Sequence, residues 1–323
     1  MTIRSPLAGQ CIMVAGGAGF IGSHLVDRLI DAGAKEIVII DNLFVGCEEN
    51  LEQALATGKA TFYCDDAELS TSLDYIFCAH EIDAVFNCAT KALNYSFQNP
   101  ANAFDTNVKV ALNLLEIQRH GGFKTLCHFS TSEVYGSAVY EPMDEGHPKN
   151  PTTTYAAGKA AADLAVESYV RMFGLDAFIV RPFNNYGPRQ NHKGHLAGII
   201  PVTARKILHG IPPEIHGDGL QSRDFIYVHD TVDAVVKLFD VLTAGETVNI
   251  STDNQTCIGN LINDIANRLE YQGEILHKPA RHSDVLSHKA SNEKVRSLIE
   301  YSLTPFDTGL QQTLDYYRHL FGR

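Results

Sequence analysis

The feature that most constrains this chain is a glycine-rich turn near its start. An apolar run at 11–14 leads into Gly16, Gly19 and Gly22, and a helical apolar pattern follows. This order predicts a strand, a tight turn and a helix. The spacing is a variant of the dinucleotide-binding fingerprint, whose glycines permit the turn, the approach of a pyrophosphate and close packing of helix on strand. The pyrophosphate would bind the N–H groups at the helix N-terminus.

The next apolar run strengthens this interpretation. Residues 36–40 read as a buried parallel strand, and Asp41 follows it. Dinucleotide-binding proteins carry an acidic side chain about 20 residues after the last glycine, where it accepts hydrogen bonds from the adenosine ribose. Because a carboxylate repels a 2′-phosphate, the sequence predicts NAD rather than NADP. The competing interpretation is a glycine-rich turn that binds nothing.

Composition limits the partners. The 323 residues suffice for one large domain or two closely joined ones. The net charge of −12 argues against nucleic acid or an anionic membrane as a partner. The seven cysteines include no C-x-x-C pair, so we expect reduced thiols and no zinc site. Because neither a leader pattern nor an apolar run of about 18 residues occurs, we expect a cytoplasmic protein.

Strand and helix patterns alternate through the first half of the chain. This predicts an α/β fold of the Rossmann type, a doubly wound parallel sheet with helices on both faces. The turn-rich second half predicts a smaller C-terminal substrate-binding lid domain over the strand ends. We expect an NAD-binding Rossmann domain at 1–181, with returning segments near 224–251, and a mainly substrate-binding domain at 182–323. The later strands are expected at 60–66, 82–90, 125–130, 177–181, 224–229 and 247–251, and the main helices at 101–120, 156–173, 198–209, 258–271 and 306–321.

A second pattern carries chemistry. Tyr155 and Lys159 begin a predicted helix, and residues four apart share one helix face. A neighbouring ammonium ion lowers the pKa of a phenol, which makes the phenolate usable as a base near neutral pH. The same spacing also occurs in ordinary surface pairs. The context favours catalysis, because polar residues at 130–133 follow the fifth predicted strand, at the sheet edge where ligands bind.

The polar run after the fifth strand has two interpretations. Thr131 is suited to hydrogen-bond a hydroxyl group that is being oxidised. Alternatively, Thr131 and Ser132 form only a capped turn. Asp65 or Asp66, after the third strand, is expected near the adenine, and the small residues Cys88 and Ala89 are expected to pass close to the cofactor ribose.

Together these residues resemble the extended short-chain dehydrogenase/reductase family, in its branch of nucleotide-sugar epimerases, dehydratases and decarboxylases. The resemblance covers nearly the whole chain. It rests on the glycine turn at 16–22, Asp41, and the segments 130–136, 155–159, 181–189, 223–230 and 281–284.

The resemblance implies a tightly bound, recycled NAD and a nucleotide-diphosphate sugar as substrate. Tyr155 would take the proton of the sugar's carbon 4 hydroxyl while hydride passes to NAD, giving a 4-keto sugar. The cofactor contacts that it implies are Gly16, Gly19, Phe20, Ile21, Gly22, Asp41, Asn42, Asp65, Ala89, Thr90, Ser130, Tyr155, Lys159 and Pro182.

The branches of this family differ in the step after oxidation. Epimerases usually carry a small residue where this chain has Glu133, whereas dehydratases use a carboxylate there to remove the carbon 5 proton before water leaves carbon 6. Decarboxylases acting on UDP-glucuronate share the Ser-Glu-Val-Tyr-Gly run. The dTDP-glucose dehydratases usually place an acidic Asp where this chain has Ser132, whereas GDP-mannose 4,6-dehydratases look similar with Thr-Ser-Glu. A 4,6-dehydratase is favoured, with decarboxylase and 4-epimerase as alternatives.

The resemblance also implies substrate contacts and an assembly. Asn184 and Arg189 come from the Asn-Asn-Tyr-Gly-Pro-Arg segment, and Arg223 and Arg281 resemble guanidinium groups that clamp a diphosphate. Each arginine has the alternative of a surface salt bridge. The helices at 101–120 and 156–173 would form a homodimer interface. A metal site at His192 and His195 is rejected because no third ligand lies nearby in the sequence.

Two other classes of protein compete with this reading. One is an NAD-binding sensor or scaffold without turnover, against which the intact set of Thr131, Tyr155 and Lys159 argues. The other is an alcohol dehydrogenase or ketoreductase that uses free NAD, which would release NADH instead of recycling it.

Overall fold

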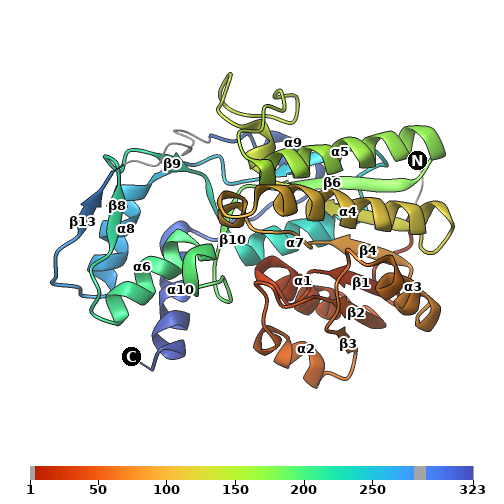
Figure 1. Cartoon of the computed structure of the whole chain (residues 1–323), viewed down its shortest axis with the longest axis horizontal. Coiled ribbons are helices and arrows are strands. Elements are labelled where there is room, and N and C mark those ends of the chain that lie inside the picture. The colour runs from red at the N-terminus through yellow and green to blue at the C-terminus, as the bar shows by residue number, and fades with distance from the viewer. Residues whose placement is uncertain (1–3, 280–288, 323) are drawn as a thin grey trace.

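A seven-stranded parallel sheet organises the computed structural model, which describes residues 4–279 and 289–322. The strand order is β11-β6-β5-β4-β1-β2-β3, so the sheet winds outward in both directions from its centre (Figure 1). This is the predicted Rossmann-type fold. The strands are β1 (Cys11–Ala15), β2 (Glu36–Ile40), β3 (Ala60–Tyr63), β4 (Ala84–Asn87), β5 (Thr125–Phe129), β6 (Asp176–Pro182) and β11 (Thr247–Ile250).

Helices cover both faces of this sheet. Ile12 and Val14 of β1 pack into the core that includes α1 (Phe20–Asp31) and α7 (Val228–Phe239). The alternate residues of β1 pack into the core of the other face, because successive side chains of a strand point to opposite sides. That face carries α3 (Ser70–Ala79), α4 (Pro100–Arg119) and α5 (Thr154–Phe173). A strand with both faces covered is apolar throughout, which explains the unbroken apolar runs.

Local signals fix where α5 begins and ends. The Thr153 side chain accepts a hydrogen bond from the Ala156 N–H at 3.2 Å, which caps the first turn. Gly174 ends the helix at a φ of 67°, a left-handed conformation that glycine adopts without strain. The cap therefore places Tyr155 in the first turn of α5, at the carboxyl edge of the sheet.

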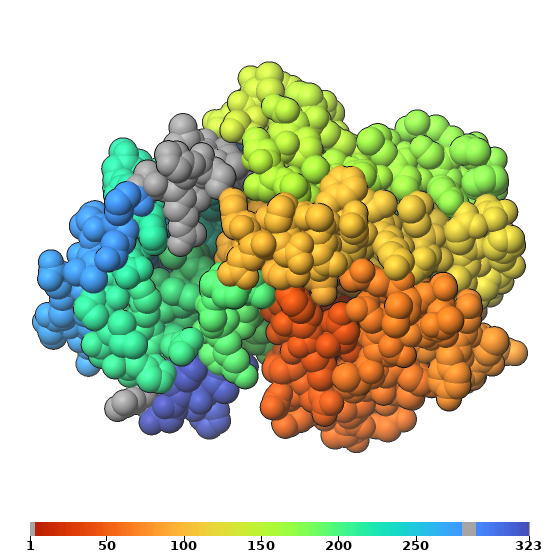
Figure 2. Space-filling view, in the orientation of Figure 1, coloured from red at the N-terminus to blue at the C-terminus, as the bar shows by residue number. Residues whose placement is uncertain are grey.

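The C-terminal region has a core of its own beside the strand ends. Helices α6 (Ile199–Leu208), α8 (Ile258–Arg268) and α10 (Phe306–Leu320) enclose it. Figure 2 shows the green, cyan and blue residues of this region gathered on one side and the red and orange N-terminal residues on the other. The remaining elements are α2 (Glu52–Ala56), α9 (Glu293–Leu298), the paired strands β7 (Asn184–Tyr186) with β10 (Phe225–Tyr227), β8 (Glu214–His216) with β13 (Leu276–Lys278) and β9 (Ser222–Arg223) with β12 (Thr256–Cys257), and the 3₁₀ turns η1 (Glu48–Leu51), η2 (Leu93–Phe97), η3 (Ser132–Tyr135) and η4 (Gly194–Leu196).

Most predicted elements are present, and the differences have local causes. The third strand ends at Tyr63 rather than at residue 66, because the two aspartates that follow turn away from the ladder and bind their own backbone. The expected strand at 224–229 is short, and α7 begins at Val228. Helix α2 was not among the expected helices, and it has only five residues, too few for a periodic pattern. Within the described residues, no helix is both long and apolar enough to cross a bilayer.

Candidate functional site

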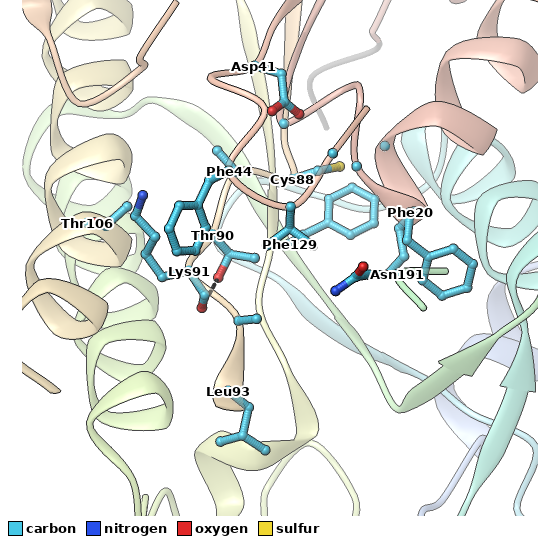
Figure 3. Close-up of a pocket in the computed structure, with 18 of the residues that line it drawn as sticks. Phe20, Asp41, Phe44, Cys88, Thr90, Lys91, Leu93, Thr106, Phe129 and Asn191 are labelled. Carbon is cyan, nitrogen blue, oxygen red and sulfur yellow. Dashed lines mark hydrogen bonds between the residues drawn. The ribbon is translucent and has the colours of Figure 1, made fainter. Parts of the chain in front are cut away.

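A cleft of about 420 Å³ opens at the carboxyl ends of the sheet strands. Figure 3 shows Asp41 at one end of it and Leu93 toward the other, with Phe44, Thr90 and Lys91 between them. All the residues predicted to contact the cofactor line this cleft, together with Thr131. They are Gly16, Gly19, Phe20, Ile21, Gly22, Asp41, Asn42, Asp65, Ala89, Thr90, Ser130, Tyr155, Lys159 and Pro182.

Two glycines of the turn, Gly16 and Gly22, leave no room for a side chain. A Cβ atom on Gly16 would lie 2.7 Å from the Ala89 nitrogen, and one on Gly22 would lie 2.1 Å from the Gly16 carbonyl oxygen. Gly16 also has a φ of +77°, which favours glycine. No described side chain caps the first turn of α1, so its N–H groups are left for an anionic ligand. This cradle fits the pyrophosphate of a dinucleotide.

Asp41 lies at the carboxyl end of β2, as expected. Its Oδ2 accepts from the Ala18 N–H at 3.0 Å and its Oδ1 from the Leu43 N–H at 2.9 Å. Burial raises the pKa of this carboxyl group, and the backbone hydrogen bonds oppose the rise. The neighbouring Asn42 donates to Oδ2 of Asp66 at 2.8 Å, which brings the residues after β3 to the same end of the cleft.

Tyr155 and Lys159 meet the end of β5. Burial raises the pKa of Tyr155 to about 12, while hydrogen bonds with Thr131 and Thr90 lower it. The Lys159 Nζ donates to the Phe129 carbonyl oxygen at 2.9 Å. Burial lowers the pKa of Lys159 to about 8. Near neutral pH the cleft thus holds a neutral phenol and a buried ammonium ion on one helix face.

Ser132 and Glu133 form the start of η3, just outside the residues that line the cleft. Ser132 is buried, and Glu133 is half-buried. The Thr131 side chain accepts from the Glu133 N–H at 3.3 Å and so caps this turn. The capped turn and a ligand role for Thr131 are therefore compatible. The charge of Glu133 raises the pKa of Tyr155, which places the carboxylate within electrostatic reach of the phenol.

The residues predicted to contact the substrate do not all line the cleft, unlike those predicted to contact the cofactor. Asn184 starts β7, and its Nδ2 is buried without a partner in the described part of the chain. Arg189 pairs with Asp27 at 2.6 Å, at a second surface pocket of about 550 Å³, and does not line the cleft. Its φ of 63° turns the chain at that point. Arg223 is half-buried in β9, outside the cleft lining. Arg281 lies outside the described residues.

Sequence reasoning missed several residues of the cleft. Lys91 is largely buried, and its ammonium nitrogen lies 3.9 Å from the centre of the Phe44 ring. This cation–π contact joins the loop after β4 to the loop after β2. No local sequence pattern predicts that the two loops lie side by side. Asn185 and Gln190 also line the cleft from the C-terminal region. The Asn-Asn-Tyr-Gly segment was a usable signal for Asn185. Among residues 4–279 and 289–322, no group of three or more His, Cys, Asp or Glu side chains is arranged to hold a metal ion.

Known proteins with this arrangement include more than one kind of enzyme. UDP-glucose 4-epimerase of Mycolicibacterium smegmatis is 31% identical, over 95% of this chain and 98% of that protein. UDP-glucuronic acid decarboxylase 1 of Xenopus tropicalis is 31% identical, over 95% of this chain and 72% of that protein. The crystal structure of dTDP-glucose 4,6-dehydratase from Streptomyces venezuelae, with NAD and TYD bound, has a TM-score of 0.91 and 28% identity, covering 97% of this chain and 98% of that one.

The sequence profile of one family spans most of the chain. It matches residues 12–251, from the first sheet strand to the end of the last. This segment holds the glycine turn, Asp41 and the Tyr155–Lys159 pair. The chain therefore belongs to the NAD-dependent epimerase/dehydratase family.

Proposed function

We propose that this chain is an NAD-dependent nucleotide-sugar 4,6-dehydratase. The glycine turn and Asp41 would hold NAD, with the pyrophosphate at the N-terminus of α1 and the adenosine ribose at the end of β2. The nucleotide-diphosphate sugar would lie over the strand ends, covered mainly by residues 182–323. When bound, NAD supplies a reversible acceptor for hydride.

Tyr155 is the proposed base of the first step. It takes the proton from the carbon 4 hydroxyl of the sugar, and the product of this oxidation is a 4-keto sugar. Thr131 hydrogen-bonds the same hydroxyl and holds it toward the phenol. The ammonium group of Lys159 and the positive charge of the oxidised cofactor would both favour phenolate, and so oppose the rise in the pKa of Tyr155 that burial causes.

Glu133 is the proposed base of the second step. The ketone at carbon 4 makes the carbon 5 proton acidic, and the Glu133 carboxylate takes that proton. The carbon 6 hydroxyl leaves as water, so that overall the proton removed from the carbon 4 hydroxyl departs with it, and Ser132 lies beside the base. Carbon 6 would then take up the hydride and carbon 5 would regain the proton held by Glu133, which leaves no net change in the cofactor. The observation that carries this proposal is the position of Glu133 at the start of η3, where its N–H is bound by Thr131, which lines the cleft together with Tyr155.

A 4-epimerase is the second candidate. It is favoured by the similarity to the Mycolicibacterium smegmatis UDP-glucose 4-epimerase, which spans 95% of this chain. In that scheme hydride returns to the opposite face of carbon 4, and Glu133 only binds substrate. A decarboxylase would instead release carbon dioxide from a 4-keto uronic acid.

Product mass separates these outcomes. The purified protein is incubated with UDP-, dTDP-, GDP- and CDP-linked sugars, and each product is weighed by mass spectrometry. Loss of water supports the dehydratase, and loss of carbon dioxide supports the decarboxylase. Unchanged mass with a new retention time supports the epimerase. Stoichiometric release of NADH would contradict all three, because each recycles the cofactor.

The assembly and location stay predictions. Helices α4 and α5 pack side by side (Figure 1), and Leu164 and Met172 of α5 are 54% and 71% exposed. These apolar side chains support the proposed homodimer through the two helices. Light scattering coupled to size-exclusion chromatography tests it, and a monomer at micromolar concentration would contradict it. A cytoplasmic location rests on composition alone.

A further inference from the structure

A buried polar network lies directly behind the Tyr155–Lys159 pair. Asp163 follows Lys159 by one more helical turn, so Tyr155, Lys159 and Asp163 stand on one face of α5. Both Lys159 and Asp163 are buried, at 2% and 0% exposure. A buried carboxylate is costly unless it is paired. The hydrogen-bond partners of the Asp163 carboxylate therefore indicate its structural role.

Asp163 ties two strand ends to α5. Its Oδ2 accepts from the Ser130 hydroxyl at 2.9 Å and from Nη2 of Arg181 at 2.7 Å. Ser130 lines the cleft directly after β5. Arg181 lies in β6, and its Nη1 donates to the Tyr135 hydroxyl at 2.6 Å. The carboxylate thus fixes one cleft residue and neutralises one buried guanidinium group.

The second oxygen of this carboxylate faces a histidine. Oδ1 of Asp163 has no hydrogen-bond partner in the described part of the chain and lies 3.9 Å from His128 Nε2. The Asn87 Nδ2 is 3.2 Å from His128 Nδ1 and donates to it, which puts the proton of the neutral ring on Nε2. Burial, with Lys159 and Arg181 nearby, holds the pKa of His128 well below its usual range. The ring is therefore neutral and leaves the Asp163 charge uncancelled on that side.

We propose that Asp163 is a positioning residue for the Tyr155–Lys159 pair: its buried carboxylate supplies the negative charge that keeps Lys159 an ammonium ion and anchors the Ser130 hydroxyl at the cleft. This inference rests on the roles of Tyr155 and Lys159 in the proposed function. In support, Asp163 raises the pKa of Lys159 against the larger effect of burial. The other titratable groups that face the network are Cys88 after β4, His128 in β5, Arg181 in β6 and Tyr135 in η3.

A direct titration of Lys159 tests the proposal without any substrate. Protein labelled with ¹³C-lysine is titrated by NMR, and the Lys159 ¹³Cε signal is assigned from its absence in Lys159→Arg. We expect a midpoint of about 8 in the unchanged protein and a midpoint lower by about one pH unit or more in Asp163→Asn. Asp163→Glu restores the carboxylate and should return the midpoint toward that of the unchanged protein. An Asp163→Asn midpoint equal to that of the unchanged protein would overturn the proposal.

Two further variants keep the test decisive. Asp163→Asn leaves Arg181 buried without its partner and is at risk of misfolding, so the neutral pair Asp163→Asn/Arg181→Gln is titrated as well. A downward shift no larger than that in Asp163→Asn is expected there, because this variant also removes the positive charge of Arg181. The absence of any downward shift overturns the proposal. Asp176→Asn removes a different, half-buried carboxylate, paired with Arg4 at the far end of β6. In Asp176→Asn the Lys159 midpoint should stay unchanged. If it shifts as much as in Asp163→Asn, the effect of Asp163 is one of general destabilisation.

Turnover provides the second readout. If the sugar panel yields a substrate, the basic limb of the pH profile of kcat should move to lower pH in Asp163→Asn, because Lys159 loses its proton earlier. If no sugar is turned over, the proposed function fails, and the NMR midpoint still decides the role of Asp163. If the Lys159 midpoint shifts but the pH profile of kcat does not move, only one part of the proposal is contradicted: the coupling of Lys159 to Tyr155.

Discussion

The two ends of β6 each hold an arginine–aspartate pair, half-buried at the amino end and buried at the carboxyl end, and the two pairs are completed differently. At the amino end, Asp176 accepts from Nε and Nη2 of Arg4 at 2.8 and 2.6 Å and from the Thr125 hydroxyl at 2.7 Å. The remaining nitrogen of Arg4 donates to two backbone carbonyls. At the carboxyl end, Arg181 and Asp163 each keep one buried polar atom without a partner in the described residues.

This difference indicates that one end of β6 contributes to stability and the other end to function. Each buried polar atom that lacks a partner costs about 1–3 kcal/mol. The side chains of Arg4 and Asp176 avoid this cost, and neither residue lines the cleft. The carboxyl end accepts it beside Ser130 and Lys159, at the edge where parallel sheets bind ligands. We interpret the amino edge of the sheet as structural and the carboxyl edge as the working edge.

The largest expected effect is at the carboxyl edge. Tyr155→Phe removes the proposed base, so turnover should fall by about 10²- to 10⁴-fold. The free energy of unfolding should change by less than about 1 kcal/mol, because the ring and its packing remain. Steady-state assays and urea unfolding measure the two effects. The matched control is Tyr140→Phe, at an exposed tyrosine, and unchanged turnover in Tyr155→Phe would remove the proposed mechanism.

The amino edge should respond in the opposite way. Asp176→Asn leaves the Arg4 guanidinium buried without a carboxylate, which should lower the free energy of unfolding by about 3 kcal/mol. Turnover per folded molecule should stay within about twofold, because no cleft residue touches this pair. Urea unfolding followed by circular dichroism gives the first value and assays below the transition give the second. A variant of full stability with lost activity would break the comparison.

Acid should weaken the network at the carboxyl edge. His128 is buried and neutral, with its pKa held well below 6.5 chiefly by burial. The unfolded chain binds a proton below pH 6.5 that the folded chain does not, so this contribution to stability is complete above pH 6.5 and falls as the pH drops. The loss amounts to about 1.4 kcal/mol per pH unit.

The variant His128→Gln isolates this contribution. Its free energy of unfolding, measured in urea at pH 7.0 and pH 5.5, should depend on pH less steeply than that of the unchanged protein. Asp176→Asn should keep the original dependence. If His128→Gln and the unchanged protein have the same slope, the network at the carboxyl edge is not the acid-sensitive part.

The smallest expected effect concerns the two ends of β2. Asp41→Asn removes the charge that would repel a 2′-phosphate, so the preference for NAD over NADP should fall by about tenfold, or 1.4 kcal/mol. Glu36→Gln, at the amino end of the same strand, should leave that preference unchanged. Isothermal titration with both dinucleotides measures it. An equal change in the NAD preference of both variants would show that the position of the charge along β2 does not determine that preference.

Residues with a local signature were found from the sequence. The glycine turn and Asp41 follow a fixed spacing within one strand–helix–strand unit, and Tyr155 and Lys159 share a helix face whatever surrounds them. That these residues line the cleft was therefore foreseeable, and their contacts with the cofactor stay a prediction. The parallel sheet followed from alternating strand and helix patterns, although a helix as short as α2 leaves no periodicity to detect.

Residues that depend on distant partners were not foreseeable. The pairing of Asp163 with Arg181 joins a helix to the following strand, and the contact of Lys91 with Phe44 joins two loops. Neither spacing has meaning before the chain is folded. Arg189 shows the converse, because a segment typical of substrate contacts turns this side chain toward Asp27 instead.

The position of β11 has a consequence for synthesis of the chain. β11 pairs with β6 and becomes the edge strand on that side of the sheet, although it comes much later in the sequence. While the chain is being made, β6 therefore stays an open edge until residue 250 has left the ribosome. Open edges present unpaired N–H and C=O groups to other chains. We expect nascent chains that stop between residues 182 and 246 to aggregate, whereas longer ones can cover the edge themselves.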